Sequence, residues 1–142
     1  MRIFNVYGPR QNPESKYSLA IPGLLSKILS GQRPVIDGTG KQSRDFIYIS
    51  DVLDAIFKIL GHSKTYGNVY NLGSGKTTSI NQLSETLLRL SRSSLRPIYG
   101  PRRAGDPEIT CAAISKIYKD IGWKPKVTLD EGLKKVMIWA QK

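Results

Sequence analysis

A glycine turn followed by a Lys-Thr pair raises the question of phosphate binding. The stretch VYNLGSGKTTSINQL, residues 69–83, has the order strand, glycine turn, Gly75-Lys76-Thr77 and helix. The phosphate-gripping loop of nucleotide triphosphatases also needs a glycine five positions before its Gly-Lys-Thr, so that the backbone can fold tightly around one phosphate. That position holds Tyr70. We therefore interpret the stretch as a strand-to-helix turn, in which Gly73 and Gly75 allow positive φ and residues 79–82 form a capping box.

Polar side chains in other turns suit a second chemistry, the clamping of a diphosphate. They are Asn5, the pair Arg44-Asp45, and Arg102-Arg103 with Asp106. The planar guanidinium fork bonds phosphate oxygens in pairs and keeps its charge at any working pH. Two separated arginines would suit one diphosphate, although each alone fits a surface salt bridge or a solvated side chain equally well.

Histidine and cysteine offer little for catalysis or metal binding. His62 is the only histidine, and it follows Gly61 among polar residues that predict a solvent-facing loop. Cys111 is the only cysteine, and no HxxxH or CxxC spacing occurs. The sequence therefore predicts no metal site and no internal disulfide, and it suits a reducing compartment. Because nothing resembles a signal peptide and the apolar runs are too short to span a bilayer, we expect a cytoplasmic protein without membrane contact.

The elements that would position these residues alternate between strands and helices. Strands are expected at 1–7, 34–36, 45–49, 68–71 and 96–99, and helices at 17–29, 51–60, 80–90, 115–122 and 128–140. This alternation predicts one α/β domain with at least part of a parallel sheet. Ser50-Asp51 is expected to cap the second helix, whose apolar residues cover most of its circumference and predict burial on more than one side. A second capping box is expected at residues 128–131.

The composition fits a globular domain with a basic surface. Apolar residues make up 39% of the 142 residues, and 22 Lys and Arg against 11 Asp and Glu give a formal charge of +11. The basic residues are scattered, and no zinc knuckle or aromatic-basic ribonucleoprotein motif is present. We therefore expect no nucleic-acid partner.

Four motifs, in this order, resemble one known family. They are RIFNVYGPRQ at 2–11, QSRDFIYISDV at 42–52, VYNLGSG at 69–75, and RRAGD at 102–106 with IGWKP at 121–125. Together they resemble the C-terminal half of the extended short-chain dehydrogenase/reductases, in particular nucleotide-sugar epimerases such as UDP-glucose and UDP-N-acetylglucosamine 4-epimerase. The resemblance covers essentially the whole chain.

The resemblance also implies a UDP-sugar site. In the family, Asn5 and the loop near Leu19 would contact the sugar nucleotide, Arg44 and Arg103 would hold the diphosphate, Asp106 would meet the ribose, and Val35 and Ile36 would form the short strand beside uracil. It further implies a glycine-rich NAD fingerprint and a Tyr-x-x-x-Lys pair upstream, and neither pattern occurs in this sequence.

We therefore expect residues 1–142 to be a single substrate-binding portion of an NAD-dependent UDP-sugar 4-epimerase, with the last strands of its Rossmann-type parallel sheet and without the N-terminal NAD-binding unit. The isolated chain is expected to have no catalytic residue, no bound NAD and no activity. The alternatives are a fragment of a sibling dehydratase or decarboxylase, or a non-catalytic binding or assembly module. An apolar sheet edge beginning at Ile3 predicts either self-association, such as a homodimer, or partial disorder over residues 1–16.

Overall fold

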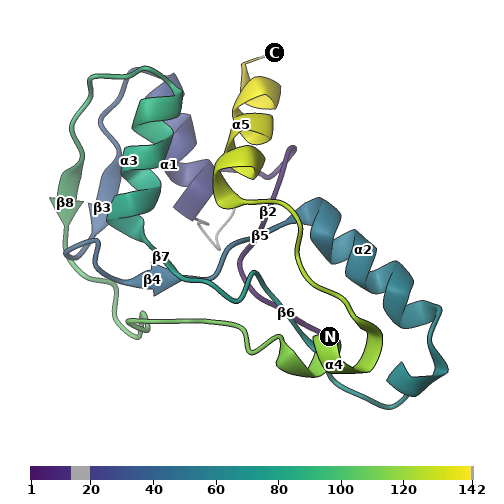
Figure 1. Cartoon of the computed structure of the whole chain (residues 1–142). Helices are drawn as coiled ribbons and strands as arrows, with labels where there is room; N and C mark the ends of the chain where they lie inside the picture. Colours follow the sequence, from purple (N-terminus) through teal and green to yellow (C-terminus); the bar gives the residue numbers. More distant parts are fainter. Residues whose placement is uncertain (14–19, 142) are drawn as a thin grey trace.

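The structure, a computed structural model, describes residues 1–13 and 20–141. Figure 1 shows short paired strands between helices, with the N-terminus at the lower end of the molecule and helix α5 at the upper end. The strands are β1 (Arg2–Ile3), β2 (Val6–Tyr7), β3 (Val35–Asp37), β4 (Ser43–Arg44), β5 (Ile47–Tyr48), β6 (Asn71–Leu72), β7 (Thr78–Ser79) and β8 (Ile98–Gly100). The helices are α1 (Ala20–Leu29), α2 (Ile49–Leu60), α3 (Ile80–Leu90), α4 (Ser115–Ile121) and α5 (Leu129–Ala140), with a 3-10 turn η1 (Ser63–Thr65) after α2. No helix of the described part of the chain is long and apolar enough to cross a membrane.

Parallel strand pairs join distant parts of the chain, which confirms the predicted α/β fold. β1 pairs with β6, β2 with β5, and β3 with β8, all in parallel, while β4 and β7 are antiparallel. Segment 45–49, expected as one strand, instead contains β5 and the start of α2, and the strand before it, β4, belongs to a different pair. The chain therefore changes strand partners at residues 45 and 46.

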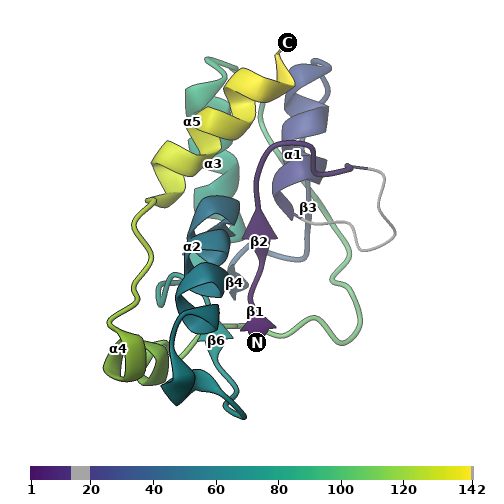
Figure 2. The same ribbon diagram turned by 90° about the vertical axis from the view of Figure 1, so that its right-hand side faces the viewer.

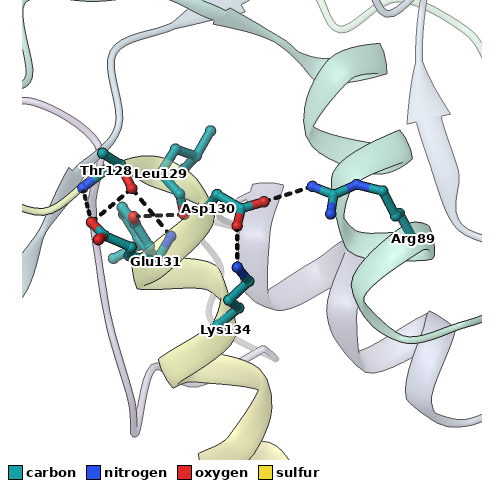
Figure 3. Close-up of polar contacts among 7 residues, drawn as sticks. Arg89, Thr128, Leu129, Asp130, Glu131 and Lys134 are labelled. Atoms are coloured by element: carbon teal, nitrogen blue, oxygen red, sulfur yellow. Dashed lines mark hydrogen bonds and ion pairs between the residues drawn. The ribbon is translucent and has the colours of Figure 1, made fainter.

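Both predicted capping boxes are present, because their residue types are sufficient to fix the first turn locally. The Ser79 hydroxyl accepts from Gln82 N–H at 3.2 Å at the start of α3, and the Thr128 hydroxyl accepts from Glu131 N–H at 3.4 Å at the start of α5. Figure 3 shows the second box and, beside it, the Asp130 carboxylate between Arg89 and Lys134. These contacts connect the first turn of α5 to α3.

Helix α2 differs from its prediction in two respects. It begins at Ile49 after Tyr48, and neither Ser50 nor Asp51 caps it through a side chain. The Asp51 carboxylate instead accepts the N–H of Val127 at 3.0 Å, and this tertiary contact replaces the local one. The expected burial on more than one side is also wrong, because the apolar side chain of Phe57 is 72% exposed.

Two hydrophobic clusters form the interior. One lies among α1, α3 and α5 and includes Tyr7, Leu24, Ile36 and Phe46. The other lies beneath α2 and includes Val52, Tyr70, Leu72 and the fully buried Trp123. The strand β2 contacts both clusters, because Tyr7 belongs to the first and Val6 packs against the second. Figure 2 shows β2 following β1 in the same direction, beside α2.

Three expectations concern residues outside the described part. The start of the first helix at Tyr17, the contact at Leu19 and the expected disorder at residues 14–16 all fall within 14–19. Residues 1–13 contain β1 and β2, and self-association through the sheet edge stays a prediction.

Candidate functional site

A cleft of about 270 Å³ lies between α1, β3 and the segment that follows β8. Its lining includes six of the seven residues predicted to form the UDP-sugar site, namely Asn5, Val35, Ile36, Arg44, Arg103 and Asp106. Leu19 lies outside the described residues. A second cleft, of about 410 Å³, lies beside residues 124–129 and contains none of the six. The first cleft is therefore the candidate site.

The two arginines reach this cleft from different elements. Arg44 lies in β4, and its side chain is only 11% exposed, whereas Arg103 follows β8 and is 57% exposed. One nitrogen of the Arg44 guanidinium donates to the backbone oxygen of Ser43 at 2.7 Å, and another pairs with the Asp106 carboxylate. The site thus has one largely buried guanidinium and one that is more exposed.

Each arginine has a carboxylate partner. Asp106 pairs with Arg44, and Asp37 pairs with Arg103. Because two positive and two negative groups line the same cleft, an anionic ligand would bind through directed hydrogen bonds rather than through an unbalanced local charge. A diphosphate would have to share or displace these carboxylates.

Asp37 is a charged lining residue that was not among the predicted site residues. The predicted strand ends at residue 36, whereas β3 continues to Asp37. The sequence does contain a signal for this residue. Asp37 directly follows the apolar Ile36 at the carboxyl end of a strand, and ligands bind at the carboxyl ends of strands in parallel α/β sheets. Gln42 also lines the cleft and donates to the backbone oxygen of Asp37 at 2.6 Å.

Apolar side chains also line the cleft. Ile36 is 1% exposed and Phe46 is 8% exposed, and the Tyr7 ring packs edge-on against Phe46 with the centroids 6.5 Å apart. The Tyr7 hydroxyl donates to the backbone oxygen of Leu129 at 3.3 Å. Burial, reinforced by the nearby Tyr48, Asp51 and Glu131, raises the pKa of Tyr7 far above its ordinary value. Tyr7 therefore stays protonated at neutral pH, and its environment is that of a packing residue rather than a general base.

Asp45 connects the cleft to the glycine turn that resembled a phosphate loop. Its fully buried carboxylate accepts the N–H groups of Ser74 at 2.6 Å, Gly75 at 2.9 Å and Ala112 at 3.0 Å. Its backbone oxygen accepts from the Asn5 side chain at 3.0 Å. The backbone donors that would hold a phosphate in a triphosphatase are occupied by a carboxylate of the chain itself, which supports the strand-to-helix interpretation.

The glycines of that turn have different roles. Gly75 has the expected positive φ of 71°. Gly73 does not, so this part of the prediction is wrong. A Cβ at position 73 would lie 2.4 Å from the Cβ of Ala112 and 2.7 Å from the Asp45 carboxylate, so a glycine is needed there for space rather than for backbone conformation.

Histidine and cysteine lie away from the cleft. The His62 ring is exposed and within 2.7 Å of the backbone oxygen of Lys58, in the loop that the sequence predicts. Cys111 is an exposed free thiol. Residues 1–13 and 20–141 contain no group of three or more metal-ligating side chains.

Comparison with known proteins shows the family. The model of the NAD dependent epimerase/dehydratase family matches residues 1–73. A putative UDP-glucose 4-epimerase of Methanocaldococcus jannaschii is 35% identical over 99% of this chain and 45% of its own length. The chain therefore spans less than half the length of that relative.

Solved structures show the same partial match. The UDP-glucose 4-epimerase of Thermotoga maritima, solved with UDP-glucose, has a TM-score of 0.92 and 34% identity over 99% of this chain and 44% of its own. The UDP-N-acetylglucosamine 4-epimerase of Methanobrevibacter ruminantium, solved with UDP-N-acetylmuramic acid, has a TM-score of 0.92 and 37% identity over the same shares. The chain belongs to the NAD dependent epimerase/dehydratase family and corresponds to a C-terminal-like part of an extended short-chain dehydrogenase/reductase.

Proposed function

We propose that residues 1–142 act as the nucleotide-sugar-binding portion of an NAD-dependent UDP-sugar 4-epimerase. The observation that supports this most is the meeting of Arg44 and Arg103, which are far apart in sequence, at one cleft with Asp106 and Asn5. A diphosphate is the ligand that two converging guanidinium forks suit best.

In this proposal, contacts with the ligand replace the two ion pairs of the cleft. Arg44 turns its fork from Asp106 to the diphosphate, and Asp106 then accepts hydrogen bonds from the ribose hydroxyls. Arg103, which is more exposed, leaves Asp37 and closes on the diphosphate from the other side. Val35 and Ile36 flank the base. Because these contacts lie on the nucleotide, the sugar itself stays free to turn near Asn5.

The described residues do not fit NAD. The glycine turn between β6 and α3 donates the N–H groups of Ser74 and Gly75 to Asp45, so it offers no cradle for the pyrophosphate of a dinucleotide. We therefore assign no step of hydride transfer to this chain. NAD would be held by the remainder of the family fold, and the 142-residue chain alone is expected to be inactive.

Titration calorimetry with UDP and uridine tests the proposal. UDP should bind, and Arg103→Ala should weaken UDP binding by about ten-fold or more, since a hydrogen bond to a charged group contributes about 1.5–3 kcal/mol. Uridine lacks the diphosphate, so the same substitution should leave uridine binding almost unchanged. Arg44→Ala should behave in the same way.

Arg102→Ala is the matched control. Arg102 is adjacent to Arg103 and 57% exposed, but it does not line the cleft, and it pairs with Glu108 instead. An equal loss of UDP affinity in Arg102→Ala and Arg103→Ala would mean that only the general positive charge matters. Absence of UDP binding to the unaltered chain would contradict the proposal outright.

The family includes dehydratases as well as epimerases, so the proposal also has to name the reaction of the complete enzyme, which we propose to be 4-epimerisation. A dehydratase or decarboxylase portion would bind its nucleotide sugar through the same arginines. Turnover of UDP-glucose or UDP-N-acetylglucosamine by the purified chain with added NAD would contradict the expected inactivity. UDP affinity that is insensitive to both arginines would instead favour a non-catalytic binding or assembly module.

A further inference from the structure

The second cleft, of about 410 Å³, differs in charge from the candidate site. Three lysines line it, namely Lys76, Lys124 and Lys126, and no aspartate or glutamate of residues 1–13 and 20–141 does. In the candidate site, by contrast, a carboxylate pairs with each of the two arginines. The volume of the second cleft falls within the range of about 300–1,000 Å³ that is usual for small-molecule sites. Because a cleft lined by one sign of charge concentrates ions of the other sign, the second cleft suits an anionic ligand.

Two buried carboxylates hold the walls of the second cleft from behind. The carboxylate of Asp45 accepts backbone N–H groups of the turn before Lys76. That of Asp51 accepts the N–H of Val127 at 3.0 Å, beside Lys126. In Figure 1, the first of these wall segments connects β6 to β7, and the second connects α4 to α5. The backbone of both walls is therefore held by the chain itself, which lowers the cost of ordering it when a ligand binds.

The polar groups of the second cleft have few partners within the chain. Lys126 lies 3.3 Å from the carboxylate of Asp54 and is 65% exposed. Within residues 1–13 and 20–141, the side chains of Lys76 and Lys124 make no hydrogen bond or ion pair. The hydroxyl of Thr78, which also lines the cleft, makes none within the same residues. The second cleft thus offers two unpaired cations and one unpaired hydroxyl to a ligand.

Several of the other lining residues of the second cleft are apolar. Phe46 belongs to the first hydrophobic cluster, and Val127 and Leu129 pack against it, whereas Ile114 packs against the second cluster. The cleft therefore lies where the two clusters meet. A small inorganic ion would leave this apolar surface in water, but a ligand with an apolar body would cover it.

We propose that the second cleft is a binding site for a phosphate monoester with an apolar body. The phosphate group carries about −1.5 to −2 charges at neutral pH, which matches the two unpaired ammonium groups. Its oxygens accept hydrogen bonds from Lys76, Lys124 and Thr78, and the apolar body lies against Phe46 and Ile114. The inference does not rest on the proposed function, because the two arginines of the candidate site do not line the second cleft.

A nuclear magnetic resonance titration of the isotope-labelled chain with phenyl phosphate tests the site. We expect saturable shifts of the backbone amides of residues 74–78 and 126–129, which form the walls of the second cleft. Inorganic phosphate lacks the apolar body, and phenol lacks the charge. Each should therefore bind at these residues more weakly than phenyl phosphate, by about five-fold or more.

Two double variants separate this site from the general basic charge of the protein. Lys76→Gln with Lys124→Gln removes both unpaired cations and should weaken phenyl phosphate binding by about ten-fold or more. Lys64→Gln with Lys119→Gln is the matched control, because these two lysines are also exposed but line neither cleft. The control should keep the affinity of the unaltered chain to within about two-fold. The amide spectra of both variants also show whether they fold.

Three outcomes would count against the inference. Absence of shifts at residues 74–78 and 126–129 would overturn it. An equal loss of affinity in the two double variants would also overturn it, since only the net charge would then matter. Inorganic phosphate that binds as tightly as phenyl phosphate would overturn the assignment of an apolar body. If these shifts appeared in a chain that does not bind UDP at the candidate site, the inference would be supported, and only the proposed function would be contradicted.

Discussion

Replacing Asp45 with asparagine tests whether one buried carboxylate holds the candidate site together. Its Oδ1 accepts both the N–H and the hydroxyl of Ser74 at 2.6 Å, and its Oδ2 accepts the N–H groups of Gly75 and Ala112 at 2.9 and 3.0 Å. Asparagine has the same shape but only one oxygen. Whichever way its amide is turned, an NH₂ group faces two donors, and at least one of those donors is a backbone N–H with no other acceptor in this arrangement.

The expected loss of stability follows from this count. A hydrogen bond to a charged group contributes about 1.5–3 kcal/mol, so losing two of them should lower the free energy of unfolding by about 3–6 kcal/mol. A domain of this kind has about 5–15 kcal/mol in total. Asp45→Asn should therefore remove a large share of the free energy of unfolding.

Urea unfolding at pH 7, followed by far-ultraviolet circular dichroism, measures the effect. Ser74→Ala is the control, because it removes only the contacts of the hydroxyl, with Asp45 and with the backbone of Lys76, and leaves the carboxylate and its backbone donors in place. We expect it to cost about 1 kcal/mol. If Asp45→Asn were no more destabilising than Ser74→Ala, the carboxylate would not be holding the three segments together, and the reasoning would be refuted.

Three further predictions concern packing, acid stability and the open strand edge. Gly132→Ala places a Cβ 2.1 Å from the Tyr7 hydroxyl oxygen. Calorimetry should therefore show that the free energy of unfolding falls by about 1–3 kcal/mol, and adding Tyr7→Phe should restore part of this stability. Hydrogen bonds from Lys134 and Arg89 lower the pKa of Asp130. The ionised Asp130 therefore stabilises the folded state above the ordinary Asp pKa, and this stabilisation is lost as the pH falls through the lowered pKa. Asp130→Asn should reduce the change in urea midpoint between pH 5 and pH 2. In hydrogen exchange of the isolated chain, the amide of Phe4, which bonds to β6, should exchange more slowly than the amide of Ile3.

A different outcome would contradict each of these three predictions. A stabilised Gly132→Ala would mean that the gain in helix propensity of about 1 kcal/mol outweighs the contact with Tyr7. An unchanged acid dependence in Asp130→Asn would leave Glu131, whose pKa the Thr128 cap also lowers, as the main source of that dependence. Equal protection of Ile3 and Phe4 would mean that the β1 edge is covered in solution.

Features that depend on a few neighbouring residues could be predicted from the sequence. Both capping boxes are an example, and so is the end of α4 at Gly122, where φ is 63°. The errors on α2 are of another kind. Its periodicity shows which side chains are apolar, but not whether anything covers them, and Phe57 is exposed although its position in the pattern resembles that of a core residue. The sequence near Asp51 predicts a helix cap, but its carboxylate instead binds the N–H of Val127, 76 positions away.

In the candidate site, too, the features that depend on distant parts of the chain could not be predicted from local sequence. Spacing alone gave no reason for Arg44 and Arg103 to meet, and their pairing was implied only by the resemblance to a family. The structure brings both to one cleft and adds Asp37, whose role depends on the position of Arg103 in space. Asp45 appeared in the sequence only as the neighbour of Arg44. Its four donors come from two distant loops, and no local pattern predicts such a set.

The short segment between β1 and β2 joins a parallel strand pair to the candidate site. Ile3 is in register with Leu72 of β6, and Asn5, two residues further on, lines the cleft. The arginines lie on other elements of the cleft, in β4 and after β8. In the proposed binding mode, a nucleotide sugar held by its diphosphate between these arginines would place its sugar toward Asn5. The Asn5 side chain donates to the backbone oxygen of Asp45, which directly follows Arg44. Asp45 would therefore link the residue expected near the sugar to one of the two arginines expected at the diphosphate.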